Sequence, residues 1–185
     1  AMLSFNGDYK RSLEIVDQGI AFAGRSGVPA ESPLRINLLR ARADALLKLG
    51  DAAAAESVVR RAIALQRKTT SDRGNHMADL QNTLGYVLSD LGRYRESLQA
   101  LSQSDIIDKA TAAAPTDHAI SLSNLASVHE NAGDYPKAVA LGQQALATLD
   151  AADVPADDPE RRMMERNHTR SLGLAGQTAQ ALPRM

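Results

Sequence analysis

The chain has 185 residues, a formal net charge of -1 and a pI near 6.5, so it offers no broad basic surface for nucleic acid. Aromatic residues make up 3% and apolar residues 44%, and alanine recurs throughout, which favours close helix packing over strands. No apolar run approaches the roughly 18 residues that span a bilayer, and there is no signal-peptide pattern. The absence of cysteine excludes disulfides and thiolate metal sites and fits the reducing cytoplasm, where we place the protein.

The main signal is a turn-like cluster of a glycine, a polar residue and often a tyrosine, which recurs along the chain. Its copies are Gly7-Asp8-Tyr9, Gly50-Asp51-Ala52, Gly92-Arg93-Tyr94, Gly133-Asp134-Tyr135 and Gly176-Gln177-Thr178. The glycines stand 43, 42, 41 and 43 residues apart, and a period of this size is typical of a solenoid. Glycine ends a helix in the left-handed conformation, and an aspartate one residue later can cap the next helix. Each cluster therefore predicts the turn of a helix-turn-helix unit.

The segments around these turns carry apolar residues at spacings of three and four, as amphipathic helices do. In chain order, the predicted helices span 8–24, 33–49, 52–70, 76–91, 94–113, 117–132, 135–151, 159–175 and 177–182. Ser32-Pro33 supplies the second helix with an N-cap and a proline at its first position. Predicted links between the repeats lie at Ser71 to Asn75, Pro115 to Asp117 and Asp153 to Pro159.

Small residues recur at fixed offsets from the turns. Gly85 and Ala126 lie seven residues before a turn glycine, while Ala55, Ser97 and Ala138 lie five residues after one. We expect paired helices to approach closely at these positions. A larger side chain there would cost about 1 to 3 kcal/mol through overpacking.

The third and fourth copies resemble the tetratricopeptide repeat family. The matching residues are Leu84-Gly85 with Gly92-Arg93-Tyr94, and Leu125-Ala126 with Gly133-Asp134-Tyr135, Ala138 and Ala145-Leu146. The usual repeat has 34 residues, so a longer period is similar to the variant in kinesin light chains and bacterial signalling proteins. The second copy departs from the signature with Arg42 and Ala52, and the fifth departs from it with Thr169 and Thr178. The resemblance implies an all-α, right-handed superhelical solenoid of antiparallel helix pairs.

The turn spacing divides the chain into a single solenoid domain of several repeats. We expect a partial repeat at 1–30, full repeats at 33–70, 76–113 and 117–151, and a partial repeat at 159–185. The outer copies each lack part of a helix pair, so we expect this segment to belong to a longer protein. Apolar residues left uncovered in the terminal repeats, Leu13, Val16 and Ile20 at one end and Met163, Leu172 and Leu174 at the other, predict homo-oligomerisation through those repeats.

The sequence lacks the patterns of an enzyme. His76, His118, His129 and His168 include no pair at the i, i+4 spacing of a helical metal site. There is no Gly-x-Ser-x-Gly elbow and no phosphate-binding loop. We therefore predict no catalytic residue, no metal site and no cofactor, and we expect the acidic cluster at Asp157, Asp158 and Glu160 to stabilise a helix N-terminus.

In the resembled family the first helix of each pair lines a concave surface on which a partner peptide lies. Counting back from the turn glycines, the predicted groove residues are Asn37, Arg40, Asp44, Asp79, Asn82, Tyr86, Ser123, Asn124, Ser127, Arg166 and Arg170. Their amides, phenol and guanidinium groups can bind an extended backbone or a carboxylate. An exposed helix face is also polar when nothing binds to it. Because acidic Asp44, Asp79 and Glu130 share the stripe, we do not expect the Lys-Asn-Arg set by which chaperone-binding relatives hold a terminal carboxylate.

The predicted function is a protein- or peptide-binding module, the sensing or docking part of a bacterial regulatory protein. A bacterial origin is favoured by the 16 arginines among the 21 basic residues. Two alternatives stay open at this stage. The segment could regulate a multidomain enzyme or transcription regulator whose output domain lies elsewhere, or it could be a self-assembly spacer.

Overall fold

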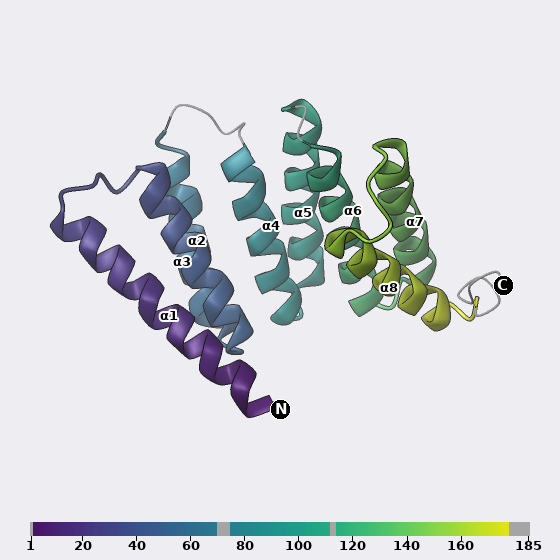
Figure 1. The fold of residues 1–185 in the computed structure, drawn as a ribbon, viewed down its shortest axis with the longest axis horizontal. Coiled ribbons are helices and arrows are strands. Elements are labelled where there is room, and N and C mark those ends of the chain that lie inside the picture. The colour runs from purple at the N-terminus through teal and green to yellow at the C-terminus, as the bar shows by residue number, and fades with distance from the viewer. Residues whose placement is uncertain (1, 70–74, 112–113, 178–185) are drawn as a thin grey trace.

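The described part of the chain, residues 2–69, 75–111 and 114–177 of a computed structural model, is a row of antiparallel helices without strands (Figure 1). Its helices are α1 (Met2–Arg25), α2 (Pro33–Lys48), α3 (Ala52–Gln66), α4 (Asn75–Asp90), α5 (Tyr94–Ala110), α6 (Pro115–Asn131), α7 (Tyr135–Ala151) and α8 (Pro159–Leu174). α1 and α8 lie at opposite ends of the row (Figure 1). The predicted all-α helical repeat solenoid is confirmed. None of the described helices is long and apolar enough to cross a membrane.

Four of the five predicted turns form as expected. Gly50, Gly92, Gly133 and Gly176 have φ values between 72° and 83°, in the left-handed region that glycine adopts without steric cost. In each turn the amide of the following residue donates to the carbonyl five residues earlier at 2.8 to 2.9 Å. This is the hydrogen bond that closes a Schellman motif. The period read from the sequence is therefore the period of one backbone motif.

The first predicted turn is wrong. α1 runs without a break from Met2 to Arg25 and includes Gly7, so no helix begins at residue 8. A single glycine inside a helix costs about 1 kcal/mol relative to alanine, which a helix of 24 residues tolerates. The left-handed glycine of this region is Gly27, with φ 71°, just after the helix ends.

The other helix boundaries lie within four residues of the predicted ones. α6 begins at Pro115 rather than at residue 117, because proline suits the first position of a helix. The predicted link at residues 71–75 and the predicted helix at 177–182 fall largely outside the described residues.

Side chains cap the helix starts that the sequence identified. The Ser32 hydroxyl accepts from the Arg35 amide at 3.3 Å, directly before Pro33. Asp158 Oδ1 accepts from the amides of Glu160 and Arg161 at 2.9 and 3.0 Å. The acidic cluster near residue 158 thus stabilises the N-terminus of α8, as predicted.

The helices form two layers. α2, α4, α6 and α8 contact one another in series, and we call these four helices the inner layer. In the described part of the chain the backbones of α3 and α5 do not pack on each other, although Arg60 of α3 pairs with Glu96 of α5 at 3.8 Å, and α5 does not pack on α7. Each of these outer helices packs instead on its own partner and on the next inner helix. Because the first helices approach one another more closely than the second ones, the row curves with the inner layer on its concave side.

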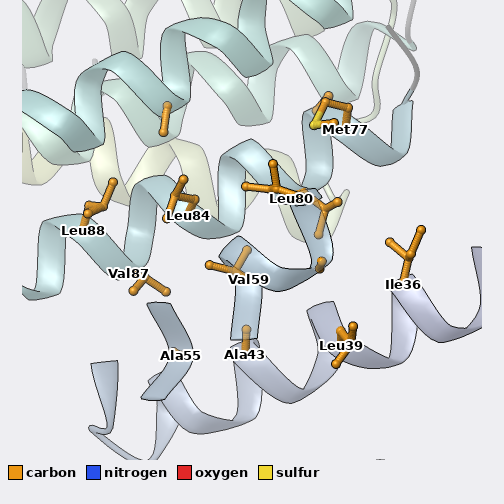
Figure 2. Packing of buried hydrophobic residues seen from close by; sticks show 14 of the residues in the cluster. Ile36, Leu39, Ala43, Ala55, Val59, Met77, Leu80, Leu84, Val87 and Leu88 are labelled. Carbon is orange, nitrogen blue, oxygen red and sulfur yellow. The ribbon is translucent and has the colours of Figure 1, made fainter. Parts of the chain in front are cut away.

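The hydrophobic core lies between the layers. Figure 2 shows Ile36 and Leu39 of α2, Val59 of α3, and Leu80 and Val87 of α4 gathered in one buried cluster. A second cluster continues the core through α5, α6, α7 and α8. Every inner helix therefore buries one side against outer helices and leaves another side for function.

Close helix contacts occur at the small residues that the sequence singled out. Ala55, Ser97 and Ala138 are fully buried. The Ser97 hydroxyl donates to the Gly85 carbonyl at 2.6 Å. A Cβ added at Gly85 would lie 2.5 Å from Cγ of Leu101, a side chain with no exposed surface in which to move.

Gly85→Ala should lower the free energy of unfolding by about 1 to 3 kcal/mol, because the added methyl group overpacks the contact between α4 and α5. Gly173→Ala is the matched control, since a Cβ at that helical glycine meets nothing within 4 Å. It should raise stability by up to about 1 kcal/mol through helix propensity. Urea unfolding followed by circular dichroism measures both, and an unchanged or higher midpoint for Gly85→Ala would contradict the packing described here.

Candidate functional site

All predicted groove residues lie on the inner layer. α2 carries Asn37, Arg40 and Asp44; α4 carries Asp79, Asn82 and Tyr86; α6 carries Ser123, Asn124 and Ser127; α8 carries Arg166 and Arg170. Side-chain hydrogen bonds join each inner helix to the next. We call this series of bonds the inner ladder.

The first rung joins α2 to α4. Thr83 Oγ1 donates to Asp44 Oδ1 at 3.3 Å, and the other oxygen of Asp44 pairs with Arg40 Nη1 at 3.4 Å one turn earlier. Asp44 therefore connects a charged surface residue of α2 to a buried hydroxyl of α4.

The second rung joins α4 to α6 and contains three predicted residues. Asn124 Nδ2 donates to Asn82 Oδ1 at 2.7 Å, and the Tyr86 hydroxyl donates to Asn124 Oδ1. Further along the same helices, Asn131 Nδ2 donates to Ser89 Oγ at 3.1 Å. The side-chain amide of Asn124 thus orients both Asn82 and Tyr86.

The third rung joins α6 to α8. The Ser171 hydroxyl donates to Glu130 Oε2 at 2.7 Å, and Arg170 Nε pairs with Glu130 Oε1 at 2.7 Å. The partners in the hydrogen bonds that join inner helices lie 38 to 42 residues apart in the sequence, about one repeat period. Each such bond contributes about 0.5 to 1.5 kcal/mol, so the ladder holds the inner helices in one register.

Comparison with known proteins identifies the repeat. Profiles of the tetratricopeptide repeat match residues 76–151 and 41–69, which together make up more than half of the chain. The chain belongs to the tetratricopeptide repeat family. Tetratricopeptide repeats are generally protein-interaction modules and typically form scaffolds without catalysis.

Solved structures share the fold at low sequence identity. Two crystal structures of a candidate kinesin light chain from Podosopora anserina, with nearly identical TPR-like repeats, are each 22% identical to this chain. They align over 95% of it, and over 82% and 83% of their own chains, with TM-scores of 0.74 and 0.72. The crystal structure of BtubC (BKLC) from P. vanneervenii is 16% identical, with 95% and 75% coverage and a TM-score of 0.67. No curated protein sequence matches the chain.

The inner surface of these tetratricopeptide repeats exposes only some of the predicted residues. Asp79, Arg166 and Arg170 are exposed, and 38% of the Tyr86 surface is exposed. Asn37, Arg40, Asp44, Asn82 and Ser127 are half-buried. These residues form the accessible groove surface.

Ser123 and Asn124 lie beneath that surface. They are 4% and 3% exposed, because α6 packs between α4 and α8 as well as against α5 and α7. Asn124 supports Asn82 and Tyr86 from below, and neither Ser123 nor Asn124 is presented to a partner in this structure. The sequence predicted that both residues contact a partner, because sequence alone does not distinguish an exposed position of α6 from a buried position next to it.

Several ladder residues escaped the sequence prediction, notably Thr83, Asn131 and Ser171. Each lies about one period from its partner, so polar pairs at the repeat spacing were the signal that could have found them. The turn glycines gave that spacing, but only the contacts show which helix faces meet.

Burial shifts the acid-base properties of this surface. It raises the pKa of Tyr86 to about 12, and the negative charge of Asp44 contributes, so the phenol stays a neutral donor. Partial desolvation by the surrounding helices also raises the pKa values of Asp44 and Asp79, although the charge of Arg40 counteracts it at both. The fold therefore disfavours negative charge here and would be stabilised by a cationic partner.

Residues 8–69, 76–111 and 114–177 contain no cluster of side chains that could hold a metal ion. No three or more histidine, aspartate or glutamate side chains of this part are placed to hold one metal ion. Among the histidines, His118 Nδ1 lies 3.0 Å from Asp105 and His129 Nδ1 lies 3.2 Å from Asp134.

Proposed function

We propose that the chain binds an extended polypeptide segment of a partner protein along the inner layer. The observation that carries this proposal is the inner ladder, which connects all four inner helices and orients groove side chains such as Asn82 and Tyr86 before any partner arrives. A prearranged surface binds more tightly because less conformational freedom is lost on association.

Two exposed side chains supply the contacts expected of an interface anchor. Tyr86 offers a partly exposed ring whose hydroxyl is already bonded, and aromatic residues of this kind dominate interface energetics. Arg166 is exposed on α8 and has no ion-pair partner in the described part of the chain, so its guanidinium is free to hold a carboxylate. The groove thus combines an apolar anchor with a cation.

The reach of a short peptide matches the inner layer. Packed helices lie about 8 to 10 Å apart, so four inner helices extend over roughly 30 Å. A 12-residue extended peptide reaches roughly 40 Å at most. One such peptide can therefore contact both Tyr86 and Arg166.

The biological setting that we propose is the sensing or docking part of a bacterial regulatory protein in the cytoplasm. The arginine-rich composition and the absence of cysteine support this setting. Two alternatives use the same fold and differ in what occupies the inner layer. In one, the segment regulates an output domain of the same protein; in the other, it self-assembles. The repeat boundaries at 33–70, 76–113 and 117–151 are proposed as the units of this single domain.

Selection from a displayed library of random 12-residue peptides tests the function. Synthetic copies of the selected peptides, labelled for fluorescence anisotropy, should bind Tyr86→Ala and Arg166→Ala at least tenfold more weakly than the unmodified chain, a loss of about 1.4 kcal/mol or more in each case. Arg166 has no partner in the described structure, so its removal should leave the fold unchanged.

Arg95→Ala is the matched control, because Arg95 is exposed on the outer helix α5. It should change the affinity by less than twofold. Peptides that lose affinity with Arg95→Ala but keep it with both inner variants would show that the outer helices carry the binding, which would contradict the proposal.

A second proposal, self-association through a terminal repeat, rests on one exposed apolar patch. Ile15 and Phe22 of α1 are 59% and 66% exposed, one above the other at helical spacing. Of the residues predicted for this role, Leu13 and Ile20 pack against the core and Leu172 is buried, so the expectation is wrong for these three. Met163 and Leu174 at the other end are 39% and 48% exposed, as the prediction requires. On α1 the sequence placed the patch on the wrong side of the helix, because sequence alone does not show which side of α1 faces α2.

Phe22→Ser should reduce the mass that light scattering reports at high concentration toward the 19.7 kDa of the monomer. Burial of a phenylalanine yields roughly 1.5 to 3 kcal/mol, enough to bias a weak association. A strict monomer at every concentration of the unmodified chain would contradict this second proposal and leave the groove proposal intact.

A further inference from the structure

An acidic cavity opens on the inner layer between α4, α5 and α6. Its volume is about 240 Å³, and its polar lining comes from Asp79 and Asn82 of α4, Ser104 and Asp108 of α5, and Asp117 and Ser121 of α6. This space is several times what a single water molecule requires, enough for the end of a long side chain. Asp79 and Asn82 also belong to the groove surface, so the cavity joins the proposed peptide path.

The hydroxyl donors of the lining are already used within the protein. Ser104 Oγ donates to the Ala78 carbonyl at 2.9 Å, and Ser121 Oγ donates to Asp108 Oδ2 at 2.7 Å. Three carboxylates share this lining, whereas no lysine or arginine belongs to it. The cavity therefore has an excess of acceptors and lacks a cation.

Asp108 is the unusual member of this set. It is only 6% exposed, and its second oxygen, Oδ1, has no hydrogen-bond partner in the described structure. Burial, together with the charges of Asp117, Asp105 and Asp79, raises the pKa of Asp108 despite the bond from Ser121. Asp108 also lies in the last turn of α5, where the helix dipole favours a positive charge.

The positions of the three carboxylates indicate which kind of cation the cavity can bind. A metal ion needs ligands that converge on one point, and in the described part of the chain no three acidic side chains do so. A guanidinium carries five N–H donors spread over a planar fork and stays charged at any physiological pH. It can therefore bond to carboxylates on different walls of a cavity.

We propose that this cavity binds the guanidinium group of an arginine side chain of the partner peptide. The inference rests on the proposed function, because the inner layer brings the peptide to the mouth of the cavity. It adds a chemical requirement to that function: the bound segment carries an arginine at the position that passes between α4 and α6.

N-acetyl-arginine amide tests the cavity without requiring any other groove contact. Its binding is followed by NMR through the backbone amides of Ser104 and Ser121, and N-acetyl-citrulline amide serves as the probe of similar shape without charge. Asp108→Asn removes the buried charge and keeps an oxygen that accepts from Ser121. Asp90→Asn, at an exposed position near the end of α4, makes the same change in net charge away from the cavity.

The arginine probe should bind saturably, and Asp108→Asn should weaken it at least tenfold, whereas Asp90→Asn should change its affinity by less than twofold. The citrulline probe should bind at least tenfold more weakly than the arginine probe. Equal binding of the two probes, or equal effects of the two variants, would overturn the inference. If Asp108→Asn does not fold, Asp117→Asn at the exposed start of α6 replaces it, with the same two outcomes.

The two proposals fail separately in these measurements. If the library peptides bind through Arg166 but the chain does not bind the arginine probe, only the cavity inference is overturned. If the arginine probe binds as expected but the affinity of the library peptides does not depend on Tyr86 or Arg166, only the groove proposal is overturned. Displacement of the probe by magnesium chloride, but not by sodium chloride at equal ionic strength, would assign the cavity to a divalent cation and overturn the inference.

Discussion

The left-handed glycine turn is the constraint on which the structure depends. By closing the first helix with a Schellman hydrogen bond, it sends the second helix back along the first in the same way in the pairs α2–α3, α4–α5 and α6–α7. The helices of a pair can then approach closely at Gly85 and Ser97, and successive first helices become neighbours. The inner layer follows from this local geometry, because one repeated turn places equivalent faces side by side.

The inner ladder turns this repetition into a surface with a fixed shape. Residues one period apart meet across the inner layer, so a polar side chain in one repeat can hold a polar side chain in the next, as Asn124 holds Asn82. A partner meets side chains whose orientation has already been set from below. Desolvation disfavours the charged forms of Asp44 and Asp79 on this layer and of Asp108 on the outer helix α5, so a cationic partner would stabilise them.

Sequence reasoning succeeds where structure is local and repeated. The turn at Gly50 and the cap at Ser32 depend on residues within a few positions, and the close contact at Gly85 recurs at a constant offset. It fails at Gly7, where the same glycine-aspartate-tyrosine pattern lies inside a helix because the surrounding residues sustain helical structure. Local pattern therefore predicts the repeat but not where the repetition begins.

The candidate site was harder to predict because it depends on contacts between repeats. Neighbouring positions of α6 point in different directions, and only the packing of α4 and α8 shows that Asn124 is a support rather than a contact. Asp108 was missed because it belongs to an outer helix, which the family resemblance does not associate with binding. Its importance comes from the cavity that three helices enclose, and no spacing along one helix encodes such a cavity.

The central claim is that the inner layer, and not the outer helices, receives the partner. Paramagnetic relaxation enhancement tests it directly, with a nitroxide attached at the middle of a 12-residue peptide that binds the chain. The account predicts that the label broadens amide signals of α4 and α6 around Tyr86 and Ser127 and spares those around Arg95 on α5. Broadening centred on α3, α5 and α7, with the inner layer unaffected, would contradict it.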